Sequence, residues 1–340
     1  MPSLHDLLLT AAHAVGITSL VLRVRRDDRC LTVLHYHGVR SPLGEPFDPG
    51  RAWFVTPEDL RKQVRFVKRQ YIFTPLHQAA EWLREGDGSR PLAALTFDLP
   101  YASVLEEGLP VLAEERVPFT VFLPSEVASS EVDPWWVRLE DAVRRCRAQV
   151  TVELEGRSRG YDLGGNRDKR RLFQQALRAV SHEPAGTAEG LADRVIAQIP
   201  VDSARNGSRG ALSWEAVRVL VRSPLADIGS HGVHLGALSP LPLKSVRQEM
   251  QVSKREIEAN AGVRVFSFCY PDGEGPQQAL RAREHLTEAG YRCALVGEEG
   301  INRPTTEPFE LRRVSILGQD SWPVFVAKVA GLDALLRRVG

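Results

Sequence analysis

Short apolar segments alternate with longer amphipathic segments along most of this chain of 340 residues. The short segments are rich in β-branched and aromatic residues and end at Gly, Pro, Asp or Ser, which is typical of buried strands. They cover residues 30–36, 91–98, 117–123, 225–229, 263–270 and 293–296. Because strands that alternate with helices pair in parallel through crossover helices, this pattern predicts an α/β fold. The length allows either two domains or one barrel with an insertion.

Two of the longer segments carry specific helix signals. Thr56 precedes Pro57 and two carboxylates, so we expect a helix that begins there and ends near Gln70. Residues 245–260 place apolar side chains on one face and stop before Gly262, which predicts a second helix.

The alternation is interrupted between residues 133 and 213. This part combines loop-forming clusters, a charged run and a pair of tryptophans, and it predicts a mostly helical insertion with a small hairpin near residues 150–161. We therefore divide the chain into five predicted segments. They are an N-terminal helical segment (1–29), the two parts of the barrel (30–132 and 213–318), the insertion (133–212) and a C-terminal helical segment (319–340).

Charge and cysteine content exclude two classes of protein. The chain has 44 Lys and Arg against 43 Asp and Glu, a net charge of +1, so it has no basic field and we predict no nucleic-acid partner. The four cysteines are widely separated and form no CxxC pair, which argues against a disulfide scaffold. We expect reduced thiols in the core.

The apolar stretch at residues 7–22 is the candidate for a targeting or membrane segment. Polar residues interrupt it, no basic segment precedes it, and it is shorter than the ~20 residues of a spanning helix. We therefore expect a short helix that rests on the protein body or peripherally on a membrane face. The predicted location is the cytoplasm, with the cell envelope as the alternative.

Polar side chains stand at the ends of several predicted strands, where the loops of an α/β barrel converge on one mouth. His35 and His37 end the first strand, Asp98 ends the second, and His231 and His234 follow the fourth. A carboxylate in Asp98's position suits a general base, although it could instead cap the next helix. The last two histidines are three residues apart and could share a metal ion if the turn permits it.

The order of these motifs resembles the polysaccharide deacetylase family with the NodB homology domain. The central motifs are Thr96-Phe97-Asp98, then Gly229-Ser230-His231, then Tyr270-Pro271-x-Gly273. Residues 35–39, 134–140, 213–215 and 308–314 also resemble family segments, so the resemblance extends from residue 30 to residue 318.

The resemblance implies a distorted (β/α) barrel of about seven parallel strands. It also implies hydrolysis of N-acetyl groups, with an N-acetylated oligo- or polysaccharide as the partner. In the family one Asp and two His hold a divalent metal, commonly zinc, whose bound water attacks the amide carbonyl. A neighbouring Asp takes the proton of that water, and a later His protonates the leaving amine.

Several chemical positions depart from the family pattern. Asp98 stands at the position of the base, but Leu99 stands where the family has its metal-binding carboxylate. His231 matches the first His ligand, whereas Leu235 falls at the second, with His234 just before it. The family's later His, which protonates the leaving amine, has no obvious counterpart in this chain.

Because leucine cannot coordinate a cation, three interpretations stay open. A rearranged zinc site could use His231 and His234 with Asp98 or His37, or a metal-free hydrolase could use Asp98 with a histidine. Alternatively, catalysis has been lost and the cleft binds a glycan or a protein. We interpret the chain as a polysaccharide deacetylase-like protein, and the sequence leaves open whether it is catalytically active. A non-catalytic glycan-binding or scaffold protein in polysaccharide biosynthesis is the alternative.

Aromatic and basic side chains complete the candidate site. We assign substrate binding to His37, Tyr101 and Tyr270, because aromatic rings stack on sugars. The resemblance also implies a buried arginine that orients the catalytic Asp. Arg312 and Arg313 are the candidates, and we expect one of them to pair with Asp98.

Overall fold

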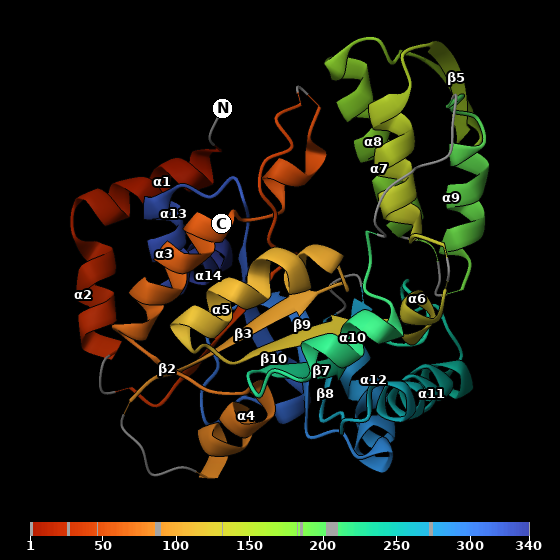
Figure 1. The fold of residues 1–340 in the computed structure, drawn as a ribbon. Coiled ribbons are helices and arrows are strands. Elements are labelled where there is room, and N and C mark those ends of the chain that lie inside the picture. Colours follow the sequence, from red (N-terminus) through yellow and green to blue (C-terminus); the bar gives the residue numbers. More distant parts are fainter. Residues whose placement is uncertain are drawn as a thin grey trace.

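The computed structural model describes residues 3–25, 28–45, 47–85, 90–130, 132–181, 183, 186–201, 210–271 and 275–339. Seven parallel strands form a closed barrel at its centre (Figure 1). In order around the barrel they are β1 (Leu31–Tyr36), β10 (Leu311–Ile316), β9 (Cys293–Glu299), β8 (Ser267–Cys269), β7 (Ala226–Ser230), β4 (Phe119–Leu123) and β3 (Leu92–Asp98). Pairing of β3 with β1 closes the ring. The predicted (β/α) barrel is therefore confirmed.

Helices cover the outside of the barrel. The two with predicted signals are α3 (Pro57–Lys68), whose N-cap Thr56 accepts a hydrogen bond from the backbone N–H of Asp59, and α11 (Leu243–Ala261), which ends at Gly262 in the left-handed conformation. The others around the barrel are α4 (Leu76–Glu85), α5 (Leu109–Glu115), α6 (Ser125–Ser129), α10 (Trp214–Leu220) and α12 (Pro276–Ala289).

Several strands differ from the sequence prediction, and the strand predicted at residues 293–296 extends to Glu299 as β9. The strand predicted at residues 263–270 is shorter, because only Ser267–Cys269 pair as β8. Leu311–Ile316, which form β10, were expected only to supply an arginine, because two adjacent charged residues are unusual in a buried strand. The two-residue strand β2 (Ile72–Phe73) pairs with the start of β3 and lies outside the ring.

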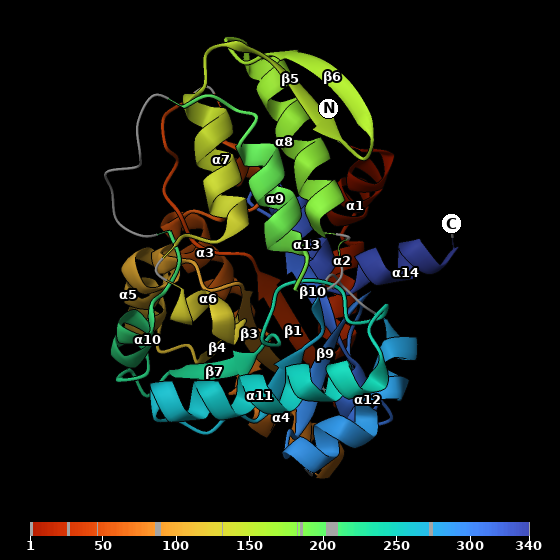
Figure 2. The ribbon, with the colours of Figure 1, turned by 90° about the vertical axis from the view of Figure 1, so that its right-hand side faces the viewer.

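A second hydrophobic core lies on the barrel mouth. It is built from α7 (Trp135–Arg145), α8 (Asn166–Ser181), α9 (Ala188–Ile196) and the antiparallel hairpin β5 (Gln149–Leu154) with β6 (Arg157–Asp162). Figure 2 shows these elements standing above the strands of the barrel. The exact segment limits at residues 133 and 212 stay a prediction.

The two ends of the chain pack together on one flank of the barrel. They form α1 (Leu4–Ala14), α2 (Ile17–Val24), α13 (Trp322–Val329) and α14 (Leu332–Val339). Leu9 of α1 packs with Val324 and Ala327 of α13. Among the described helices none is alone long and apolar enough to cross a membrane, and only α1 with α2, bent by 72°, pass that test as a pair.

Candidate functional site

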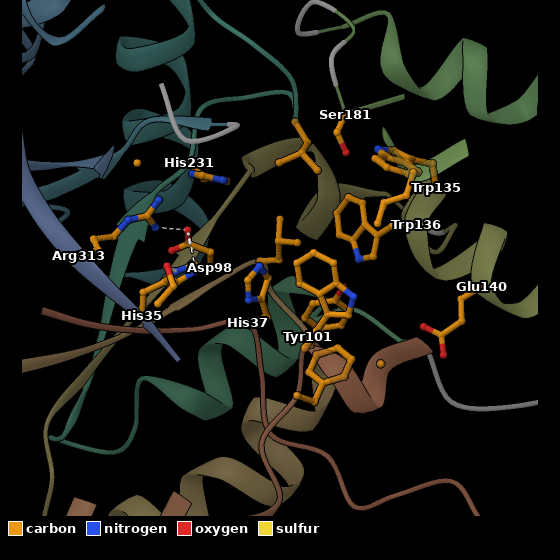
Figure 3. Close-up of a pocket in the computed structure, with 18 of the residues that line it drawn as sticks. His35, His37, Asp98, Tyr101, Trp135, Trp136, Glu140, Ser181, His231 and Arg313 are labelled. Carbon is orange, nitrogen blue, oxygen red and sulfur yellow. Dashed lines mark hydrogen bonds and ion pairs between the residues drawn. The ribbon is translucent and has the colours of Figure 1, made fainter. Parts of the chain in front are cut away.

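A cavity of about 460 Å³ lies between the carboxyl ends of the barrel strands and helices α7 and α8 (Figure 3). Its floor is polar and comes from the strands. Its walls and roof are largely aromatic and apolar, and they come from the loops and the two helices. The residues that line the cavity include His35, His37, Trp53, Phe54, Asp98, Leu99, Tyr101, Trp135, Trp136, Glu140, Phe173, Leu177, Ser181, His231, Leu235, Tyr270 and Arg313.

Asp98 is the centre of the polar floor. Its Oδ2 accepts a hydrogen bond from Arg313 Nη1, lies 3.2 Å from His35 Nε2, and accepts a weak bond from the Cys269 thiol at 3.6 Å. Burial alone would raise the pKa of Asp98, but the charges of Arg313 and His35 outweigh it and hold the pKa well below its usual range. Asp98 is therefore a fixed carboxylate, whose buried Oδ1 has no hydrogen-bond partner within the described ranges.

Arg313, not Arg312, makes the contact with Asp98. Its Nε donates to the carbonyl of Val296 at 3.0 Å, which fixes the guanidinium beneath the cavity. The side chain of Arg312 lies on the other face of β10, where its Nε donates to Glu298 at 3.3 Å near the surface. The alternation of side chains along the strand separates the two arginines.

Two histidines, one at the end of β1 and one just after it, lie beside this pair. His35 Nδ1 is 3.2 Å from the Ser315 hydroxyl, and His37 packs between the rings of His35 and Trp53, with centroids 4.8 and 4.9 Å away. Burial, assisted by the charge of His35, lowers the pKa of His37 to about 3. His37 is thus a neutral ring, and its buried Nδ1 has no partner in the described part of the chain.

His231 and His234 are not brought together. His231 Nδ1 is 2.8 Å from the carbonyl of Cys269, so this nitrogen carries the proton and Nε2 is left as an acceptor; burial lowers the pKa of the ring. His234 follows a turn at Gly232, whose φ is +86°, and lines a separate cavity. There its Nδ1 is 2.7 Å from Glu249, and this bond raises the pKa of His234.

Leucines occupy the two remaining ligand positions that the resemblance implies. Leu99 and Leu235 both line the cavity beside His231. The backbone of Leu99 has φ +74°, a conformation that Gly, Asn and Asp adopt readily and a leucine rarely does. Its N–H donates to the carbonyl of Phe122 at 3.1 Å, so the pairing of β3 with β4 continues into this turn.

Aromatic side chains form the walls. Tyr101 packs edge-on against Phe54 at 4.7 Å between ring centroids and lies 6.3 Å from Trp136. Tyr270 is fully buried and packs edge-on against Phe268. Together with the half-exposed ring of Trp53, these side chains give the cavity aromatic walls, a lining suited to a sugar ring.

Helices α7 and α8 supply the roof. Phe173, Leu177 and Ser181 are four residues apart on α8 and therefore share the face that meets the cavity. On α7, Trp135 is almost fully buried, and its Nε1 has no hydrogen-bond partner among the residues described. Glu140 of the same helix accepts a hydrogen bond from Arg40 at 3.3 Å, and burial raises its pKa.

Sequence reasoning missed several of these residues. His35 was named at the end of the first strand but given no role, although the period of two along a strand places it on the same face as His37. Cys269 stands next to Tyr270 in sequence and was not singled out. Glu140 lies in the segment 134–140, which supported the family resemblance, but the sequence alone assigned it no role. Ser181 and Phe173 had no signal, because they reach the cavity only through the packing of α8 on the barrel.

A cluster that could hold a metal ion lies at the floor. The ligand atoms of Asp98, His231 and Cys269 are all within 4.8 Å of one another. Burial raises the pKa of the Cys269 thiol well above its usual value, so this group is a neutral S–H. Arg313 Nη1 contacts both Asp98 and Cys269, the latter at 3.4 Å, so the cluster already contains a cation.

Comparison with known proteins identifies relatives by sequence and by fold. The family described as Polysaccharide deacetylase matches residues 191–294, less than half of the chain. No curated protein sequence is significantly similar to the chain. Among solved structures, the Streptococcus pyogenes deacetylase PplD in complex with acetate is 14% identical, with a TM-score of 0.57 over 91% of this chain and 97% of that one.

Two further structures have the same fold. IcaB from Ammonifex degensii is 18% identical, with a TM-score of 0.56 over 89% of this chain and 97% of that one. The BpsB deacetylase domain from Bordetella bronchiseptica is 17% identical, with a TM-score of 0.52 over 85% of this chain and 97% of that one. At these identities the likeness establishes the shared fold.

Proposed function

We propose that this chain, a polysaccharide deacetylase-like protein with a NodB-type barrel, binds an N-acetylated saccharide at the barrel mouth without hydrolysing it by the family's metal-dependent reaction. The proposal is carried by one observation: the cavity is present, but leucines occupy two of the three positions at which the family resemblance implies metal ligands. Leu99 and Leu235 line the cavity, and His231 alone keeps a coordinating atom.

The residues present do not fit the metal that the resemblance implies. One imidazole does not make a zinc site, which needs three protein ligands even when catalytic. The alternative cluster of Asp98, His231 and Cys269 holds the Arg313 guanidinium against two of its members. A divalent ion there would lie against a buried positive charge and would require a thiolate that burial disfavours.

The cavity nevertheless retains what a saccharide needs. Its volume of about 460 Å³ is in the usual range for small-molecule sites. Two residues that line the cavity carry buried polar atoms without a partner in the described residues: Asp98 Oδ1 can accept a hydrogen bond from a hydroxyl or amide, and Trp135 Nε1 can donate one to a carbonyl. Satisfying such atoms on binding favours a ligand rich in hydroxyl and acetamido groups.

A rearranged hydrolase is the second candidate, favoured by the proximity of Asp98, His231 and Cys269. Elemental analysis of protein purified without a metal-binding tag separates the two candidates. We expect no stoichiometric zinc in the natural chain, and zinc bound by the double variant Leu99→Asp, Leu235→His. Adding His231→Ala to that variant is the control and should remove the ion. About one ion per natural chain, lost in His231→Ala, would establish the rearranged site instead.

Binding is tested separately by calorimetry with short N-acetylglucosamine oligomers, using glucosamine oligomers of the same length as the control. We expect binding of the acetylated series with no release of acetate. Trp53→Ala should weaken it by roughly tenfold, because this half-exposed ring lines the cavity. Trp82→Ala, an equally exposed tryptophan on α4 away from the cavity, should bind normally. No binding by the natural chain would refute the proposal.

A further inference from the structure

We propose that α1, α2 and the start of α14 form a docking surface for a membrane that contains anionic lipids. Eight of the sixteen exposed large apolar side chains in the described part of the chain lie on these helices. They are Leu4, Leu7, Leu8, Val15, Ile17, Leu20, Val24 and Leu335. The remaining eight are distributed over the rest of the molecule.

The exposed side chains form continuous stripes. In α1 and the residue after it, Leu4, Leu8 and Val15 are separated by four and seven residues, and they are 76%, 49% and 73% exposed. In α2 the stripe is Ile17, Leu20 and Val24, at 44%, 62% and 71%. Because these spacings keep side chains on one face of a helix, each helix presents an apolar edge to the outside.

These stripes are not the faces that hold the helices in place. α1 is attached through Leu9, which is fully buried against α13, and α2 through Leu22, which joins the barrel core. Both helices are therefore apolar on two sides, one packed and one free. A soluble surface helix has a polar outer face, so the outer face here indicates a second apolar environment.

The charge of this surface fits anionic lipid. Arg23 is exposed at the end of α2, and α2 contains no acidic residue, whereas the next arginine, Arg25, donates to the carbonyl of Ala330 at 2.6 Å and faces the protein. Asp6, the acidic residue of α1, accepts a hydrogen bond from Ser3 in the capping box at the start of that helix. Basic residues beside an apolar stripe are the pattern of helices that lie in a membrane interface.

The same charge argues against a second copy of the chain as the occupant. A two-fold dimer would bring this patch against itself and place the positively charged Arg23 of each copy against an apolar surface, where burial of the charge is costly. In Figure 1 the two helices form the left flank of the barrel, and α7, α8 and α9 stand at the upper right. A membrane against α1 and α2 therefore does not cover the roof of the cavity.

Vesicle co-sedimentation of the full chain tests the proposal. We expect binding to vesicles of phosphatidylcholine with phosphatidylglycerol, weaker binding to phosphatidylcholine alone, and loss of the difference at high salt. The variant Leu8→Glu, Leu20→Glu should lower the bound fraction by roughly tenfold or more. The matched control Leu243→Glu, Leu280→Glu changes two exposed leucines of α11 and α12 and should bind normally.

Two results would overturn the proposal. The natural chain could stay in the supernatant with both vesicle types, or the stripe variant could bind as well as its control. Dimerisation in analytical ultracentrifugation that only the stripe variant abolishes, without vesicle binding, would assign the surface to a second copy. Arg23→Gln, which leaves the apolar stripes intact, provides an independent readout and should reduce binding only to the anionic vesicles.

Discussion

Replacing Arg313 with methionine tests whether the floor of the cavity is held by a desolvated ion pair. Arg313 and Asp98 are 6% and 7% exposed, and Arg313 also donates to the Val296 carbonyl. Removing one member of a buried ion pair leaves the other charge uncompensated, which costs about 3–5 kcal/mol. We expect Arg313→Met to lower the free energy of unfolding by that amount, measured by urea denaturation with tryptophan fluorescence.

Arg312→Met is the matched control because the two arginines are neighbours on β10. Arg312 pairs with Glu298 at the surface, and a solvated pair of this kind contributes about 0–1 kcal/mol. A cost below about 1 kcal/mol for Arg313→Met, or equal costs for the two variants, would refute the account of a desolvated pair.

The pH dependence gives the same prediction a second readout. The pKa of Asp98 in the folded protein lies below its unfolded value, so its contribution to stability is present above about pH 4 and is lost as the pH falls through the folded pKa. Without Arg313, burial raises that pKa and the carboxyl group can take up a proton. The difference in stability between natural chain and variant should therefore shrink from pH 7 to pH 4, and a constant difference would contradict the argument.

Two further predictions concern positions outside the cavity floor. A Cβ added at Gly262 or at Gly160 would meet no atom within 4 Å, but only Gly262 has a positive φ. Gly262→Ala should therefore lower the free energy of unfolding by about 1–2 kcal/mol, measured by thermal or urea unfolding, whereas the control Gly160→Ala should not lower it. His234 has a raised pKa through Glu249, so His234→Gln should lose most stability below pH 6.5, and the loss should fade as the pH rises through the raised pKa. A pH-independent loss would exclude that ion pair as the cause.

The sequence predicts the barrel well because its strands are locally distinct. Residues 30–36, 91–98 and 117–123 are predominantly apolar and coincide closely with β1, β3 and β4. β10 shows the limit of that reasoning. Its two arginines give no local signal of a buried strand, and only the family resemblance led us to expect that one of them pairs with Asp98. The structure shows that Arg313 makes this pair, with a residue 215 positions away in sequence. Long-range pairing of this kind has no local signal.

The candidate site was predictable only in part, for similar reasons. Asp98, His37, Tyr101, His231 and Tyr270 follow strand ends, and the structure gathers them around one cavity. His234 does not join them. Spacing in sequence placed it three residues from His231, but the turn at the intervening glycine directs its side chain to Glu249 on α11. The acidic partner, not the spacing, decides where this ring lies.

The contacts of Leu99 explain how the barrel mouth can keep its shape without a bound ion. A leucine with positive φ carries strain of about 1–2 kcal/mol, and a carboxylate or amide residue would carry less. The strain persists because the turn is fixed from three sides. Leu99 N–H donates to Phe122, Tyr101 N–H donates to Leu99, and Leu212 N–H donates to Pro100. The Leu99 side chain also packs against the core formed by α7–α9. The backbone that would present a ligand is thus maintained by sheet and roof contacts rather than by an ion, so the cavity can persist as a binding site independently of metal.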